Sequence, residues 1–265
     1  DKIEIGNTAA KAAVDIALHD LIGKIRNQPC HQMFAADKRK LLYTTYTIPM
    51  DELSEIRKRV KEAKEYKILK VKLGSPEDKK IIEEIRRITD QDIIVDANEG
   101  WADRNFALDM IQCLAAHKVL FVEQPMPKEQ IDDIAWLSSR SPIPIIADEA
   151  VKRFSDIEKA KGIYSGINIK LMKCAGLQEA QKMILQARKY GMKIMIGCMS
   201  ETSCAVSAAA QLAPLADWID LDGPLLIKED YFDGVKFSEG KIILNDMPGI
   251  GVNPLTNSYR LWKGQ

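Results

Sequence analysis

The sequence contains acidic residues that each come at the end of a short apolar run. Asp96 ends the run DIIVD, Glu123 ends VLFVE, and Asp148 directly follows IPIIA. Carboxylates that converge in one place repel one another and raise one another's pKa, and a hard cation removes that cost. A ligand set of oxygen atoms alone favours Mg²⁺, with Mn²⁺ as the alternative, over zinc. These three residues are therefore predicted to bind a divalent metal ion.

Lysine residues take the same kind of position in two further runs. Lys70 and Lys72 lie in ILKVKL, and Lys170 lies in INIKL. A metal ion beside a lysine lowers the pKa of its ammonium group, which suits a general base at neutral pH. The later run WIDL contains Asp220 and continues to Asp222, on the same face of the chain. Lysine bases beside a metal ion are thus the predicted chemistry.

These charged residues interrupt segments that otherwise read as buried strands. Strands of a parallel sheet are expected to be near-continuous apolar runs, and here one parity of each run is apolar while the other carries a charge. For one acidic residue alone, a solvated strand end or an ion pair is the simpler interpretation. A series on the same parity, at the same strand ends, favours a single site at the C-terminal ends of barrel strands, where such folds place their chemistry. The predicted strands cover residues 44–48, 68–73, 92–96, 119–123, 143–147, 167–171, 193–197 and 218–221.

Longer amphipathic segments separate the predicted strands. Ser75-Pro76-Glu77 predicts a helix with proline at its first position, and the segment 176–190 ends before Gly191, which is typical of a helix C′ glycine. No Gly/Ser-rich linker occurs between residues 43 and 225. The alternation predicts an α/β protein with a (β/α)8-type TIM barrel. An open doubly wound sheet is the alternative, but no G-x-G-x-x-G follows the first strand.

Both ends of the chain differ from the barrel pattern. Asn7 or Thr8 is predicted to cap a helix that reaches about Gly23. We interpret the two end segments as remnants of an α+β capping domain, most of which is missing from this chain. The predicted division is residues 1–24 as the C-terminal helix of that domain, 25–225 as the barrel with the active site, and 226–265 as a segment with short β structure that returns to the capping domain.

Composition and charge exclude several classes of partner. Lys plus Arg and Asp plus Glu both total 38, so the net charge is zero, which argues against a nucleic-acid or anionic membrane surface. No apolar run approaches the length of roughly 18 residues that a membrane span needs. The five cysteines are scattered, which favours free thiols in the cytoplasm over disulfides or zinc sites. The oligomeric state is left open, with a homo-oligomer as one option.

Five motifs in order carry a resemblance to a known family. They are KVK at 70–72, DANEGW at 96–101, VEQP at 122–125, ADEA at 147–150 and NIKLMKCAGL at 168–177. Together they resemble the muconate lactonizing subgroup of the enolase superfamily, over residues 8–256. The resemblance implies a modified (β/α)7β barrel, Lys72 and Lys170 as the paired acid/base groups, and Asp96, Glu123 and Asp148 as Mg²⁺ ligands. Lys70 is a further positive charge toward the substrate.

The eighth predicted strand narrows the implied reaction. Its DLDGP, with Asp220 and Asp222, resembles the D-x-D of dipeptide epimerases, which holds the free α-ammonium group of the substrate. The TTYTI run with Thr45 and the IGCMSETS loop with Ser200 and Glu201 are also similar to that family, and by analogy line the substrate site. The implied function is a Mg²⁺-dependent epimerisation of a dipeptide, L-Ala-D/L-Glu from peptidoglycan turnover foremost. One lysine removes the α-proton and the other returns a proton on the opposite face, through a metal-stabilised enolate.

Other functions share most of these motifs. Muconate cycloisomerases, o-succinylbenzoate synthases and N-succinylamino acid racemases use the same scaffold but bind no ammonium group, so they do not need a D-x-D. The alternative interpretation of DLDGP is a strand followed by a turn at Gly223-Pro224. A catalytically inactive metal-binding barrel is the non-enzyme alternative. The intact lysine pair and the complete set of carboxylates argue against it.

Overall fold

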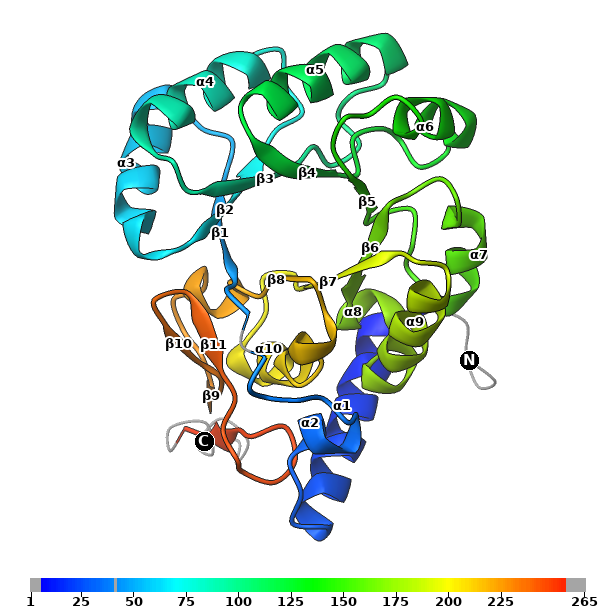
Figure 1. The fold of residues 1–265 in the computed structure, drawn as a ribbon. Helices are drawn as coiled ribbons and strands as arrows, with labels where there is room; N and C mark the ends of the chain where they lie inside the picture. The colour runs from blue at the N-terminus through cyan, green and yellow to red at the C-terminus, as the bar shows by residue number, and fades with distance from the viewer. Residues whose placement is uncertain (1–5, 41, 256–265) are drawn as a thin grey trace. The chain divides into compact units, whose positions relative to one another are not determined.

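The computed structural model describes residues 6–40 and 42–255 (Figure 1). Strands β1 to β8 follow one another in the sheet in chain order. The contacts of the chain group into two compact units, which are described separately. The first unit comprises residues 1–44, 169–186 and 194–265, and the second comprises 45–168 and 187–193.

The second unit repeats a strand followed by a helix. Its elements are β1 (Thr45–Ile48), α3 (Leu53–Glu62), β2 (Ile68–Lys72), α4 (Asp78–Ile88), β3 (Asp92–Asp96), α5 (Arg104–Ala116), β4 (Val119–Glu123), α6 (Ile131–Ser138), β5 (Ile145–Ala147), α7 (Ile157–Ala160) and the first residues of β6 (Gly166–Lys170). All of its paired strands are parallel, and the register sets Lys72 beside Asp96 and Asp96 beside Glu123. Adjacent strand ends therefore bring these three residues together.

The first unit contains the remaining strands and both end segments. Its elements are α1 (Thr8–Ile25), α2 (Cys30–Met33), α8 (Leu171–Cys174), most of α9 (Leu177–Lys189), β7 (Lys193–Gly197), α10 (Ser203–Ala210), β8 (Trp218–Asp220), and the short strands β9 (Phe232–Asp233), β10 (Lys236–Ser238), β11 (Lys241–Ile243) and β12 (Asn253–Pro254). Helix α1 is tied to the start of α9, because the Asp15 carboxylate accepts a hydrogen bond from the backbone N–H of Leu177 at 2.5 Å. In the pair β7–β8, Gly197 lies beside Asp220.

The predicted strands are confirmed to within two residues at each end, and the short β structure after Pro224 is present. Gly191 ends the α9 segment with a left-handed backbone, φ 72°, as predicted. Two details are wrong. Asn7 precedes α1 but its side chain forms no capping hydrogen bond, since its backbone is itself left-handed at φ 49°. Pro76 is not the first helical residue: α4 begins at Asp78, whose carboxylate instead organises the turn before it.

Both faces of the central strands are buried, including the face that carries charge. In β2, Leu69 and Lys70 are 0% and 2% exposed, and in β3 both Val95 and Asp96 are 0% exposed. The charged parity seen in the sequence is therefore an interior feature and not a solvated edge. The predicted domain boundaries stay a prediction, and their parts at 1–5 and 256–265 lie outside the described residues. In the described part of the chain, no helix is long and apolar enough to cross a membrane.

Helix α5 begins with a side-chain cap that can be tested alone. The Asp103 carboxylate accepts a hydrogen bond from the backbone N–H of Phe106 at 2.8 Å. Because Asp103→Ala leaves that N–H without its partner, we expect the free energy of unfolding to fall by about 1 kcal/mol in urea denaturation. Asp103→Asn, whose side chain caps equally well, is the matched control and should stay within a few tenths of a kcal/mol of the wild type. Equal stability of the two variants would contradict the capping role.

Candidate active site

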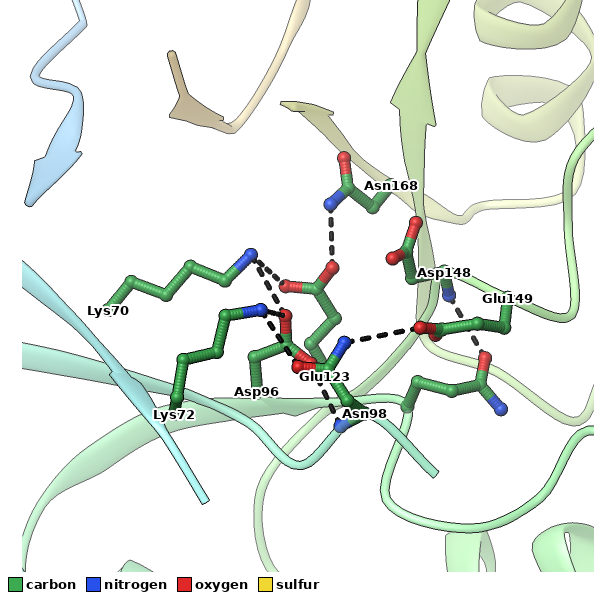
Figure 2. Close-up of polar contacts among 9 residues, drawn as sticks. Lys70, Lys72, Asp96, Asn98, Glu123, Asp148, Glu149 and Asn168 are labelled. Atoms are coloured by element: carbon green, nitrogen blue, oxygen red, sulfur yellow. Dashed lines mark hydrogen bonds and ion pairs between the residues drawn. The ribbon is translucent and has the colours of Figure 1, made fainter. Parts of the chain in front are cut away.

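A buried group of one lysine and two acids lies in the middle of β2 and at the ends of β3 and β4 (Figure 2). The Lys70 Nζ lies 3.1 Å from the Asp96 Oδ2 and 2.8 Å from the Glu123 Oε2. The three side chains are at most 2% exposed. Charges removed from water pay a desolvation cost of several kcal/mol each, which close pairing offsets. The Lys70 ammonium thus compensates two carboxylates that have no access to solvent.

Lys72 also contacts the Asp96 carboxylate, and its side chain is partly exposed to solvent. Its Nζ donates to the Asp96 Oδ2 at 2.6 Å and to the Asn98 Oδ1 at 2.8 Å, while its side chain remains 28% exposed. The Asn98 backbone N–H donates to the other oxygen of Asp96 at 3.0 Å, and the Asn98 amide donates to Glu149 at 3.2 Å. Two oxygen acceptors therefore orient the Lys72 ammonium (Figure 2).

The second oxygen of Glu123 is bound by an amide side chain. The Asn168 Nδ2 on β6 donates to the Glu123 Oε1 at 2.7 Å, and Asn168 is 0% exposed. The Asn168 Oδ1 is buried and accepts no hydrogen bond from any described residue. A buried carbonyl oxygen without a donor is costly, and it adds a further oxygen atom of the kind that hard cations prefer.

Gln124 holds the backbone that carries Asp148. Its Oε1 accepts hydrogen bonds from the backbone N–H groups of Asp148 and Ala150, both at 3.1 Å. Its Nε2 donates to the Met126 carbonyl at 3.0 Å and to the Tyr164 hydroxyl at 3.1 Å. Burial raises the pKa of Tyr164 to about 12, so the hydroxyl stays neutral. The amide of Gln124 uses all of its hydrogen-bonding capacity and places Asp148, which is 1% exposed.

The acidic residues suit a divalent cation in chemistry and burial. Asp96, Glu123 and Asp148 present oxygen donors alone, and each is at most 1% exposed. The described residues nevertheless contain no group of three or more His, Cys, Asp or Glu side chains already arranged to hold a metal ion. The physical reason is visible in the contacts: Asp96 and Glu123 converge on the Lys70 ammonium and not on each other. The predicted metal site stays a prediction.

The other unit contains a second group of titratable residues. Lys170 at the end of β6, Asp220 at the end of β8 and Asp222 are 6%, 4% and 3% exposed. Burial, with the negative charges of the two aspartates and of Glu201, raises the pKa of the Cys198 thiol well above its usual value. Burial also raises the pKa of Glu201, which is opposed by the hydrogen bond from the Met199 N–H and by the charge of Lys170. These residues therefore act on one another electrostatically.

The remaining predicted substrate residues differ in their surroundings. Ser200 is exposed and Glu201 is half-buried. Thr45 is 1% exposed at the start of β1, where the register sets it beside Ile68, whereas Thr47 lies beside Lys70. Their substrate roles stay predictions.

Sequence reasoning did not single out the amide residues of the site. Asn98, Gln124 and Asn168 stand inside DANEGW, VEQP and NIKLMKCAGL. They are uncharged, so they do not interrupt a buried strand in the way that an acid or lysine does. Their position beside the predicted acids in each motif was the one signal that pointed to them.

Comparison with known proteins identifies the family. The profile for the enolase C-terminal domain-like family matches residues 51–258. The chain belongs to the enolase superfamily. The N-terminal domain of the mandelate racemase / muconate lactonizing enzyme group matches residues 1–34, so the predicted resemblance is confirmed.

Relatives of known activity are epimerases. The L-Ala-D/L-Glu epimerase of Bacteroides thetaiotaomicron is 54% identical over 253 residues, which cover 95% of this chain and 66% of that protein. The L-Ala-D/L-amino acid epimerase of Pedosphaera parvula is 38% identical over 94% of this chain and 73% of its own length. These relatives are isomerases that act on amino-acid derivatives, and the chain spans about two thirds to three quarters of their length.

Solved structures agree on the fold. The substrate-liganded L-Ala-D/L-Glu epimerase of Bacillus subtilis superimposes with a TM-score of 0.90 at 31% identity, over 95% of this chain and 74% of that one. A dipeptide epimerase of Cytophaga hutchinsonii, complexed with Mg and D-Ala-L-Val, gives 0.91 at 26% identity, over 97% and 73%. The chain therefore has the predicted (β/α)8-type TIM-barrel fold of this superfamily.

The buried acid–lysine group makes a prediction about stability. Lys70→Met removes the ammonium that compensates Asp96 and Glu123 and leaves two buried carboxylates with less positive charge. Without added metal ions, we expect the free energy of unfolding in urea to fall by about 3–5 kcal/mol. Lys58→Met, at a lysine whose side chain is 66% exposed, is the control and should change it by less than about 0.5 kcal/mol. A Lys70→Met protein as stable as this control would show that the ion pairs are not formed.

Proposed function

We propose that this chain is the catalytic part of a Mg²⁺-dependent dipeptide epimerase that acts on L-Ala-D/L-Glu, with the substrate a small molecule of peptidoglycan turnover in the cytoplasm. The observation that carries the proposal is the Lys72 ammonium, held 2.6 Å from the buried Asp96 carboxylate at adjacent strand ends. The 54% identity to an L-Ala-D/L-Glu epimerase supports the choice of dipeptide.

Asp96, Glu123 and Asp148 would hold the metal ion. When bound, Mg²⁺ supplies positive charge that stabilises the negative charge developing on a substrate carboxylate as its α-proton leaves. Two solved relatives, from Cytophaga hutchinsonii and Methylococcus capsulatus, are described as complexed with Mg. Mn²⁺ has the same preference for oxygen ligands and is the alternative. The Asn168 amide orients Glu123, and the Gln124 amide fixes the backbone of Asp148.

The two lysines carry the proton transfer. In the neutral form, the Nζ of Lys72 accepts the α-proton and becomes an ammonium, while the ammonium of Lys170 donates a proton to the opposite face of the same carbon and becomes neutral. The net result is inversion at that carbon with no change in composition. Lys70 keeps its positive charge beside the carboxylates and adds to the stabilisation of the substrate's negative charge. The reverse reaction exchanges the roles of the two bases.

Asp220 and Asp222 are proposed to bind the free α-ammonium group of the dipeptide. Both are buried, and a buried carboxylate pairs favourably with an ammonium group that approaches it closely. Thr45, Ser200 and Glu201 are the further residues proposed to line the substrate. A free amine is therefore a requirement of the proposal, and it separates a dipeptide epimerase from a racemase of N-succinylated amino acids.

Single removal of each lysine tests the two-base scheme. We expect Lys72→Ala and Lys170→Ala each to lower epimerisation of L-Ala-L-Glu by at least about 100-fold, because general acid–base catalysis by one positioned group contributes about 10²–10⁴-fold. In D₂O, each variant should still exchange the α-proton of one epimer, and the two variants should act on opposite epimers. Mass spectrometry and ¹H NMR measure both rates.

The same assay distinguishes the rival functions. N-acetyl-L-Ala-L-Glu, which lacks the free amine, is the control substrate and should react far more slowly with the wild type. Wild-type epimerisation in either lysine variant would rule out the two-base scheme. An absence of α-proton exchange in the wild type with Mg²⁺, using protein extended to the full length of its relatives, would favour an inactive metal-binding barrel.

Metal binding can be measured without turnover. We expect Asp148→Asn to weaken Mn²⁺ binding, followed by EPR, by more than about 100-fold, and Asn168→Leu to weaken it by about 10–100-fold because the amide orients Glu123. Asp109→Asn, at an aspartate that is 60% exposed, should leave the affinity unchanged. Chelation with EDTA should abolish epimerisation, and Mg²⁺ should restore it. Equal affinity in the Asp148→Asn protein and the wild type would remove Asp148 from the ligand set.

A further inference from the structure

A buried carboxylate that takes no part in the proposed chemistry joins two loops of the site. Asp78, the first residue of α4, is 0% exposed. Its carboxylate accepts hydrogen bonds from the backbone N–H groups of Gly74 and Ser75 at 2.9 Å each, and from the Ser75 hydroxyl at 2.9 Å. It also accepts a hydrogen bond from the indole Nε1 of Trp101 at 2.8 Å. All of these donors are neutral, and within the described chain no basic side chain pairs with Asp78.

The backbones of the same two loops touch. Gly74 has a left-handed backbone at φ +128°, which disfavours any other residue. A Cβ added at Gly100 would lie 2.6 Å from the Gly74 Cα and 2.8 Å from the Ala97 carbonyl oxygen. The loop after β2 and the loop after β3 therefore approach more closely than side chains would allow. We call Gly74, Ser75, Asp78, Gly100 and Trp101 the loop clamp.

The loop clamp lies directly beside the proposed base. Lys72, the last residue of β2, is two residues before Gly74, and Asp96, the last residue of β3, and Asn98 precede Gly100. The Lys72 Nζ contacts one atom from each of these residues, at 2.6 and 2.8 Å (Figure 2). Between them, the Leu73 N–H donates to the Asp96 carbonyl at 2.9 Å. A displacement of one loop against the other would lengthen both contacts of the ammonium.

We propose that Asp78 and Trp101 are positioning residues for Lys72: their hydrogen bond locks the loop that follows the base on β2 to the loop that follows Asp96 and contains Asn98. This inference rests on the proposed function, in which Lys72 transfers the α-proton. The rate of proton transfer falls steeply when a general base is displaced from its target, since a misplacement of about 1 Å can cost about 100-fold. The indole of Trp101 is 1% exposed, so it contributes to the site from within the protein and not as a surface that stacks on substrate.

The proposal predicts an effect on one base and not on the other. Asp78→Asn keeps the size of the side chain but turns one of its accepting oxygens into a donor. That donor faces either the Trp101 Nε1 together with the Gly74 N–H, or the Ser75 N–H. The Lys170→Ala protein reports exchange by Lys72 alone, and the Lys72→Ala protein reports exchange by Lys170 alone. Added to these backgrounds, Asp78→Asn should lower α-proton exchange in D₂O about tenfold or more in the first and less than about threefold in the second.

A second readout needs neither metal nor turnover. Competitive acetylation followed by peptide mass spectrometry measures the reactivity of the Lys72 amine, with the exposed Lys61 as internal reference. Loss of the contacts to Asp96 and Asn98 should raise the labelling of Lys72 severalfold in the Asp78→Asn protein. Trp101→Phe, which removes the N–H donor and keeps an aromatic ring, should shift both readouts in the same direction and is the variant to use if Asp78→Asn does not fold.

Asp103→Ala is the matched control, because it weakens the start of α5 two residues beyond Trp101 and leaves the clamp's hydrogen bonds intact. Asp103→Ala should lower the Tm, but it should not lower α-proton exchange more in the Lys170→Ala background than in the Lys72→Ala background. Equal losses in the two single-base backgrounds, or no change in Lys72 labelling, would overturn the positioning role. If the single-base parents, in which Asp78 is intact, exchange no α-proton, the proposed function fails instead, and the labelling result still decides whether the clamp positions Lys72.

Discussion

The Asp96 carboxylate is the point on which the charged interior depends. It is 0% exposed and lies against two ammonium groups, that of Lys70 at 3.1 Å and that of Lys72 at 2.6 Å. A carboxylate in that position is tolerated only when it is compensated, because the desolvation of a lone charge costs several kcal/mol. The parallel register of β2, β3 and β4 supplies that compensation by bringing alternate residues of neighbouring strands to the same height. Charge and topology therefore support each other at this point.

Neutral amide side chains orient the charged residues of the site. Asn98 orients Lys72, Asn168 orients Glu123, and Gln124 holds the backbone of Asp148. Amides suit this task because they provide donors and acceptors without adding charge to the buried interior. Preorganised groups of this kind need little rearrangement when charge develops on a substrate. The loop clamp extends the same principle one step outward, from the side chains of the site to the loops that carry them.

Membership of the enolase superfamily and the chemistry of these residues point to the same reaction class. The relatives compared above are named as epimerases, and the acids and lysines proposed for the reaction lie at strand ends here, all buried except Lys72, which is partly exposed. The two proposed bases belong to different compact units of the chain, Lys72 to residues 45–168 and Lys170 to residues 169–186. Each unit by itself contains one base with acidic neighbours. The proposed inversion needs one proton donor and one proton acceptor.

Much of the fold and of the charged site was predictable from the amino-acid sequence. Period-two runs and the charges that interrupt them located the eight strands and the residues Asp96, Glu123, Asp148 and Lys170, because a charge in a buried strand is costly enough to stand out. Only the tertiary structure showed which atoms meet. It paired Lys70 with both Asp96 and Glu123, gave Gln124 and Asn168 their roles, and started α4 at Asp78 instead of Pro76. Those contacts join residues far apart in the chain or depend on loop backbone geometry, and neither local periodicity nor residue type encodes them.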